Sequence, residues 1–129
     1  MPPKESLYPK DWFRIADKDF KRTQQLLKLE DPEGAAYNLQ QAVEKYLKGF
    51  LLSKGWQLKR IHDLEVLLND ALKYEPSLEE FREVCQEITD YYLLNRYPLL
   101  TSVTLTTKQV QGSLDQARKF IARLKVLTK

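Results

Sequence analysis

Four polar side chains share the spacing of one helix face, and their types could serve a nucleotide phosphate. At about 100° per residue, this face gathers Gln41, Glu44, Lys45 and Lys48, with Tyr37 one turn earlier. The two lysines could contact a phosphate, and the face as a whole offers charge and hydrogen bonds. The simpler interpretation is a solvated helix face on which Gln41 and Glu44 provide intrahelical pairs.

The single histidine of the chain, His62, stands directly before Asp63. The two could form an imidazole–carboxylate pair that orients a substrate or donates to phosphate. Alternatively, Asp63 caps the next helix, and His62 contacts backbone or the preceding helix. One histidine without a spaced partner does not make a metal site. Because no glycine-rich phosphate loop, zinc motif or hydrolase nucleophile is present either, the sequence predicts no metal, no cofactor and no catalytic residue.

A second polar cluster lies further along the chain and includes Tyr92, Arg96 and Tyr97. Its tyrosines could stack on a base, and the guanidinium of Arg96 could fix a phosphate. The alternative is structural, with the rings packed at a bundle end and Arg96 paired with an acidic residue. The candidate ligand contacts are therefore Gln41, Lys45, Lys48, His62 and Arg96, with support from Tyr37, Glu44, Asp63, Tyr92 and Tyr97.

The elements that must position these residues are helices. Apolar side chains recur at three- and four-residue spacing in five segments, which are about 10–29, 32–54, 63–74, 77–95 and 107 onward. Asp31 and Asp63 are predicted N-caps, Gly55 a predicted C-cap, and Ser77 with Glu80 a capping box. Thr106 or Thr107 should cap the last helix, after an extended connector over 99–105. The sequence predicts an all-α, up-and-down antiparallel bundle of four main helices and one shorter helix.

Length and composition indicate one globular domain over residues 1–129. The chain is 43% hydrophobic and 30% charged, which is typical of a soluble protein rather than a disordered tail. Its net charge of +3 permits an anionic ligand without requiring one. Cys85, the only cysteine, excludes an intrachain disulfide and is predicted to lie in the core. Because no apolar run is long enough to cross a bilayer, we expect no membrane association and a cytoplasmic location.

Three fragments, QQAVEKYLKGFLLSKG, HDL and YYLLNRYP, together resemble the HEPN domain family (higher eukaryotes and prokaryotes nucleotide-binding). The resemblance covers nearly the whole chain, from Trp12 to the last predicted helix. It implies an antiparallel four-helix bundle with a short additional helix. It also implies frequent dimerisation and a frequent link to a minimal nucleotidyltransferase, encoded beside the HEPN protein or fused to it.

Many HEPN proteins are ribonucleases that carry an arginine and, a few residues later, a histidine, supplied by both subunits of a dimer. In this sequence Arg96 matches the arginine, but the histidine positions hold Thr101, Ser102 and Val103. Cleavage by the 2′-hydroxyl is helped by a group that titrates near neutral pH, and histidine is its usual supplier. Without it, Arg96 could still stabilise phosphate charge through its guanidinium.

The leading hypothesis is a non-catalytic HEPN-like module that binds a nucleotide or nucleic acid such as RNA, or partners a minimal nucleotidyltransferase in a toxin–antitoxin type of pair. Two alternatives stay open. One is a metal-independent ribonuclease toxin, with Arg96 as phosphate clamp and His62 as a displaced acid–base group. The other is a purely structural bundle whose polar face is only solvated. In all three, the two tryptophans, the many tyrosines and the family habit suggest a homodimer.

Overall fold

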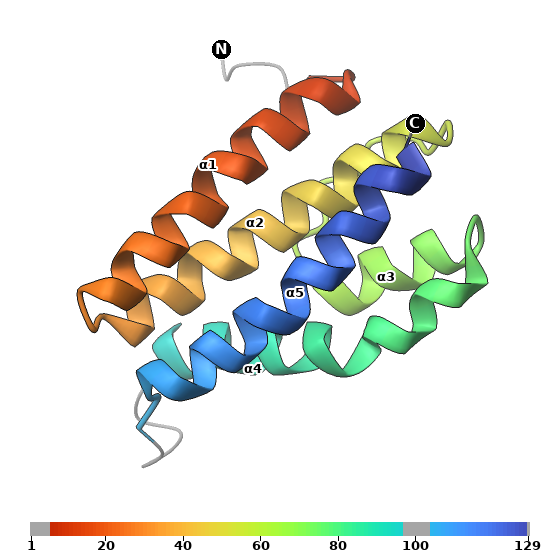
Figure 1. The fold of residues 1–129 in the computed structure, drawn as a ribbon. Helices are drawn as coiled ribbons and strands as arrows, with labels where there is room; N and C mark the ends of the chain where they lie inside the picture. Colours follow the sequence, from red (N-terminus) through yellow and green to blue (C-terminus); the bar gives the residue numbers. More distant parts are fainter. Residues whose placement is uncertain (1–5, 97–103, 129) are drawn as a thin grey trace.

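The computed structural model describes residues 6–96 and 104–128, and within these ranges it contains helices and no strand (Figure 1). Five α-helices and one 3-10 helix follow one another along the chain: α1 (Pro9–Lys28), α2 (Pro32–Ser53), α3 (Leu64–Leu72), η1 (Pro76–Phe81), α4 (Arg82–Arg96) and α5 (Thr107–Thr128). Four helices are long, and α3, with 9 residues, is the shorter one. The all-α prediction is confirmed.

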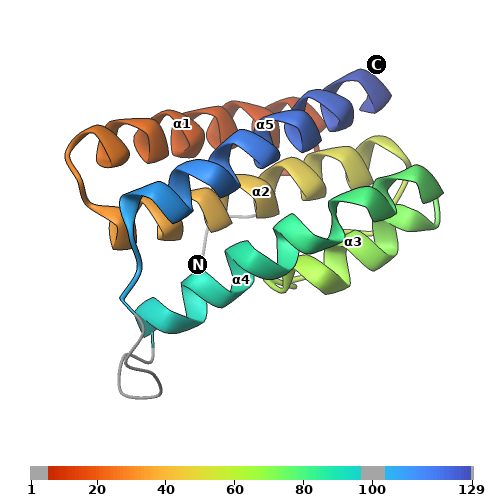
Figure 2. The same ribbon diagram turned by 60° about the horizontal axis from the view of Figure 1, so that its bottom comes forward.

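The central element of the bundle is α2, which packs against α1, α3, α4 and α5. The chain runs down α1, back up α2, down α4 and up α5 (Figure 1). The helices α1 and α5 are therefore antiparallel, and in the view of Figure 2 both lie above α2. The short α3 lies beside α4 at the opposite side of α2 from α1 (Figure 2). This is the predicted up-and-down arrangement, and it leaves α2 with little surface of its own.

Local capping signals explain where several helices begin and end. Asp31 accepts a hydrogen bond from the Gly34 amide at 3.0 Å, and Asp63 accepts one from the Glu65 amide at 2.9 Å. Gly55, just beyond α2, has a φ of +87°, a left-handed conformation that favours glycine. All three predicted caps are confirmed.

The start of α5 holds a reciprocal capping box. The Thr106 hydroxyl accepts from the Gln109 amide at 3.2 Å, and the Gln109 side chain accepts from the Thr106 amide at 3.0 Å. The prediction that Thr106 or Thr107 caps this helix is confirmed, with Thr106 as the capping residue. Most of the predicted extended connector over 99–105 lies outside the described residues.

The capping box predicted at Ser77 does not form. Residues Pro76–Phe81 form a 3-10 helix, and α4 begins only at Arg82. The Ser77 hydroxyl donates to Glu75 at 2.8 Å and accepts from Arg123 of α5 at 2.7 Å. The serine is therefore engaged in a tertiary contact rather than in capping its own helix, which a local sequence pattern could not reveal.

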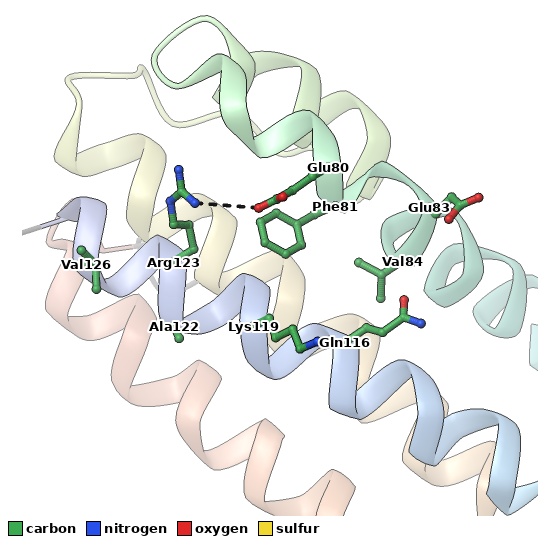
Figure 3. A pocket seen from close by; sticks show the side chains of 9 residues that line it. All are labelled: Glu80, Phe81, Glu83, Val84, Gln116, Lys119, Ala122, Arg123 and Val126. Carbon is green, nitrogen blue, oxygen red and sulfur yellow. Dashed lines mark ion pairs between the residues drawn. The ribbon is translucent and has the colours of Figure 1, made fainter.

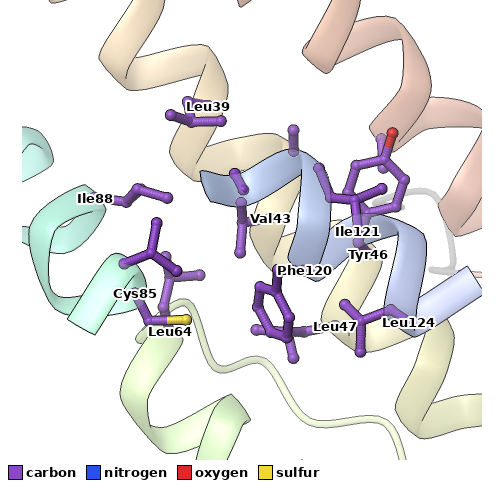
Figure 4. Close-up of a cluster of buried hydrophobic side chains, with 14 of the residues drawn as sticks. Leu39, Val43, Tyr46, Leu47, Leu64, Cys85, Ile88, Phe120, Ile121 and Leu124 are labelled. Carbon is purple, nitrogen blue, oxygen red and sulfur yellow. The ribbon is translucent and has the colours of Figure 1, made fainter. Parts of the chain in front are cut away.

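The hydrophobic core lies where α2 faces α3, α4 and α5, and Figure 4 shows a part of it. Fully buried side chains meet there from different helices, including Leu47, Phe50, Ile88 and Phe120. The Phe120 ring stacks on Phe81 with centroids 4.7 Å apart. Within the described ranges, no helix combines the length and apolarity needed to span a membrane.

Cys85 is fully buried, as predicted, and burial raises the pKa of its thiol from 9.0 to about 12. Between these values the unfolded chain releases the thiol proton while the folded chain keeps it. We therefore expect the free energy of unfolding to fall as pH rises from about 9 toward about 12, with a contribution of up to about 1.4 kcal/mol per pH unit.

The measurement is urea unfolding at a series of alkaline pH values, with Cys85→Ala as the matched variant. Burial and Asp17 also raise the pKa of Tyr46, so both proteins lose stability in base, but the variant should have the shallower slope. Identical slopes would show that the thiol does not contribute.

Candidate functional site

A buried carboxylate, Glu44, organises the polar site on α2. One of its oxygens accepts from the Lys48 ammonium at 3.1 Å and lies 3.0 Å from Nδ1 of His62. The other oxygen accepts from the Gln40 amide at 3.3 Å. We call these four residues, Gln40, Glu44, Lys48 and His62, the Glu44 network. Both carboxylate oxygens have partners, as a buried ionised group requires.

The network is built by one helix and the segment that follows it. Gln40, Glu44 and Lys48 are four residues apart on α2, so their side chains line one face. Residues 54–63, the connector between α2 and α3, return along this face and bring His62 to it. The Gln40 amide also donates to the main-chain carbonyl of His62 at 3.1 Å, so both the backbone and the ring of His62 are held.

His62 combines a buried anchor with an exposed ring. The Glu44 side chain is 5% exposed, whereas the His62 side chain is 74% exposed. With the proton on Nδ1 donated to Glu44, Nε2 faces solvent in a fixed orientation. An imidazole held in this way can donate to a phosphate when protonated, or accept from a sugar or base when neutral.

The helix-face interpretation placed Lys48 and Glu44 at the surface, and this placement is wrong. Lys48 is 1% exposed and Glu44 is 4% exposed. The Lys48 ammonium lies 5.5 Å from the centre of the Trp12 ring of α1, which covers it. Because 13 of the 22 residues of α2 are buried, even its polar face is enclosed by neighbouring elements. Lys48 therefore balances the charge of Glu44 and is not available to a ligand in this conformation.

The other predicted residues of α2 are only partly available. Lys45 is half-buried and pairs with the buried Asp19 of α1 at 2.5 Å. Gln41 donates to the Gln40 side chain at 2.8 Å, which extends the Glu44 network toward the surface. Tyr37 is exposed and stacks on Tyr92 of α4, with centroids 6.2 Å apart, so these two supporting residues do meet.

The imidazole–carboxylate pair exists, but its carboxylate is Glu44 rather than Asp63. Asp63 caps α3 by accepting from the amides of Glu65 and Val66. Arg96 is the last residue of α4, and its side chain lies outside what the structure describes. Tyr97 is likewise outside the described residues. The association of Arg96 and Tyr97 with His62 thus stays a prediction.

Sequence reasoning missed Gln40, whose amide donates both to Glu44 and to the main-chain carbonyl of His62 and so ties the connector to α2. Its four-residue spacing from Glu44 was a usable signal, but the contact with His62 spans 22 residues and depends on the path of the connector. Two cations, Lys59 and Arg60, precede His62 on the same connector. Lys59 reaches Asp70 only at 3.9 Å, and Arg60 is exposed with no carboxylate partner within residues 6–96 and 104–128.

A separate groove of about 550 Å³ lies between the η1–α4 segment and α5 (Figure 3). Glu80 and Glu83 stand on one wall, and Lys119 and Arg123 stand on the other. Arg123 and Glu80 approach to 3.8 Å across it. The groove contains none of the predicted site residues. In the part of the chain that the structure describes, no group of three or more histidine, cysteine, aspartate and glutamate side chains is placed to hold a metal ion.

Comparisons with known proteins agree with this architecture. The model of the HEPN domain family matches residues 9–127. The crystal structure of TT1696 from Thermus thermophilus is similar, with a TM-score of 0.77 and 26% sequence identity. The similarity covers 92% of this chain and 97% of TT1696. A search of curated protein sequences gives no significant match.

Proposed function

This chain belongs to the HEPN domain family, and on that premise we propose that it binds a phosphate-bearing nucleotide or nucleic acid without cleaving it. The ligand contacts are His62 and Arg60 of the connector, with Gln41 and Lys45 at the edge of the same site. The buried Lys48 does not contact the ligand but pairs with Glu44, which in turn holds the His62 ring. Arg96 is a further ligand contact, because it matches the arginine of the family motif.

One observation carries the proposal: an exposed imidazole is held in place by a fully partnered buried carboxylate. An exposed histidine that only filled space would not need two anchors from α2, one on its ring and one on its carbonyl. Pre-orientation lowers the entropy cost of binding, because the side chain is already ordered before the ligand arrives. Arg60, two residues earlier on the connector and exposed, supplies a guanidinium suited to phosphate.

We expect wild-type protein to bind ATP or a short RNA in isothermal titration calorimetry, and His62→Ala to bind about tenfold to a hundredfold more weakly. The estimate corresponds to the loss of one hydrogen bond to a charged group. Arg60→Ala should weaken binding by a similar factor and also reduce its dependence on salt.

The matched control is Gln86→Ala, an exposed position on α4 that should leave the affinity unchanged. Circular dichroism of each variant would establish that the helices are retained. Two results would contradict the proposed site: a wild type that binds none of ATP, GTP and RNA, or a wild type that binds them with the same affinity as His62→Ala.

The Glu44–His62 pair also supports a second candidate function, cleavage of RNA. A carboxylate that fixes the ring and leaves Nε2 toward solvent is the arrangement of a general acid–base group. The histidine expected after Arg96 in the family motif is replaced by other residues, and for this reason we place binding first.

A cleavage assay without metal ions separates the two functions. The binding proposal predicts that wild type cleaves RNA no faster than His62→Ala. Cleavage by wild type that falls at least about a hundredfold in both His62→Ala and Arg96→Ala would establish the ribonuclease instead.

We further propose that the module acts as a homodimer and partners a minimal nucleotidyltransferase in a toxin–antitoxin type of pair. Family membership supports this part of the proposal. Residues 97–103, which follow Arg96, lie outside the described ranges. Light scattering that shows only a monomer across a wide concentration range would reject the homodimer. A protein that dimerises but binds neither a ligand nor a nucleotidyltransferase would be the purely structural dimerising bundle.

A further inference from the structure

A second cationic surface lies between α1 and α5, away from His62. Two adjoining hollows of about 540 Å³ and 290 Å³ share Gln24 and Arg118 and together form what we call the α1–α5 groove. Tyr46 lines this groove, whereas Glu44 holds His62. Since side chains two residues apart on a helix point in nearly opposite directions, the groove and the His62 site lie on different sides of α2.

The charge of the groove is strongly one-sided. Its lining contains four cations and one carboxylate; the cations are Lys21, Lys28, Arg118 and Lys125, and the carboxylate is Asp17. The excess of three positive charges equals the net charge of the whole chain, so the remainder of the protein is balanced. The groove therefore carries a local excess of positive charge that favours an anion.

The single acidic group of the groove is already occupied. Asp17 accepts from Lys125 at 2.9 Å and from the hydroxyl of Tyr46. The charges of the other cations are less neutralised by carboxylates. Arg118 lies over the Phe20 ring, donates to the side-chain oxygen of Gln24 at 2.7 Å and reaches Asp115 only at 3.8 Å. Lys21 and Lys28 are exposed and pair with no carboxylate in the described part of the chain. Three cations therefore remain for an incoming anion.

The cations are spread along the groove rather than gathered around one point. Lys28 and Asp17, the partner of Lys125, are eleven residues apart on α1, which corresponds to roughly 16 Å along the helix. A single phosphate can accept only from donors within about 3 Å of its oxygens, so cations at this spread need several phosphates in a row. Between them lies the half-buried Phe20 ring with the Arg118 guanidinium 5.3 Å from its centre, and this pair offers a surface on which a base can stack, whereas Leu27 and Ile121 are buried.

From this geometry we propose that the α1–α5 groove binds the backbone of a single-stranded nucleic acid. A single strand can bring successive phosphates to the cations and an unpaired base to the Phe20 ring, whereas a duplex keeps its bases paired inside. The inference rests on the proposed function for the class of ligand, but it assigns that ligand a separate surface and a longer contact.

The test is fluorescence anisotropy of a labelled oligouridylate of twelve nucleotides, titrated with full-length protein at several salt concentrations. Three phosphate contacts predict a slope of log affinity against log salt of about −2.1, because each contact on a single strand contributes about −0.7. Lys21→Ala combined with Arg118→Ala leaves one of the three contacts, so it should reduce the slope to about −0.7 and lower the affinity roughly tenfold at low salt.

The matched control is Lys10→Ala combined with Lys108→Ala, which removes two exposed positive charges outside the groove. It should keep nearly the wild-type slope, whereas equal effects of the two double variants would overturn the inference, as would the absence of oligouridylate binding by wild type. If groove variants have no effect but ATP binding still depends on His62, only the groove fails. If oligouridylate binding depends on the groove and not on His62, the groove stands and the His62 site fails.

Discussion

We expect the Glu44→Leu variant to lose about 3–5 kcal/mol of unfolding free energy, because it leaves the Lys48 ammonium buried without its anion. Lys48 is 1% exposed, and its contact with the Trp12 ring is too weak to replace an ion pair. Urea unfolding followed by circular dichroism measures the loss directly. A decrease of this size is a large fraction of the total stability of a typical domain.

The decisive control is the double variant, Glu44→Leu with Lys48→Met. A buried ion pair replaced by apolar side chains of similar volume is often neutral or stabilising, so the double variant should recover most of the lost free energy. Recovery would show that the pair is needed for charge balance and not for packing. A double variant as unstable as Glu44→Leu alone would contradict this account of the network.

We expect Phe120→Ala to cost about 3–5 kcal/mol, the range for removing a buried aromatic ring from a packed core. Phe120 of α5 is fully buried (Figure 4). Its ring stacks on Phe81, the last residue of η1, so its removal leaves a cavity between two elements and ends an aromatic contact. The midpoint of thermal or urea unfolding would measure the cost.

Two further variants serve as references for the size of the loss in unfolding free energy. Phe120→Leu fills more of the space than alanine and should therefore cost less. Lys119→Ala, at the neighbouring exposed position, should change the unfolding free energy by no more than about 0.5 kcal/mol. Comparable losses for Phe120→Ala and Lys119→Ala would mean that this part of the core is not tightly packed.

The helices could be predicted from sequence because their signals are local. Apolar spacing and capping residues such as Asp31, Asp63 and Thr106 act within one or two turns, and the structure confirms them. The exception was Ser77, whose hydroxyl is engaged by Arg123 from 46 residues away. A local capping pattern contains no information about a side chain of another helix that hydrogen-bonds to the serine hydroxyl.

The residue types of the candidate site could be predicted from the sequence, but the burial of its side chains could not. Spacing correctly grouped Glu44 and Lys48 on one face of α2 and pointed to His62. It could not show that Trp12 of α1 covers Lys48, nor that the connector carries His62 back to Glu44. Burial depends on which elements surround a helix, and periodicity describes only the helix itself.

The central position of α2 has a consequence for the motions of the molecule. Its backbone amides are shielded by α1, α3, α4 and α5 together, and no single neighbour can detach without uncovering apolar core. Exchange of these amide hydrogens with deuterium should then require opening of the entire bundle, whereas the ends of α1 and α5 can exchange by fraying. The amides in the middle of α2 would therefore exchange most slowly, and their protection from exchange would report the free energy of global unfolding.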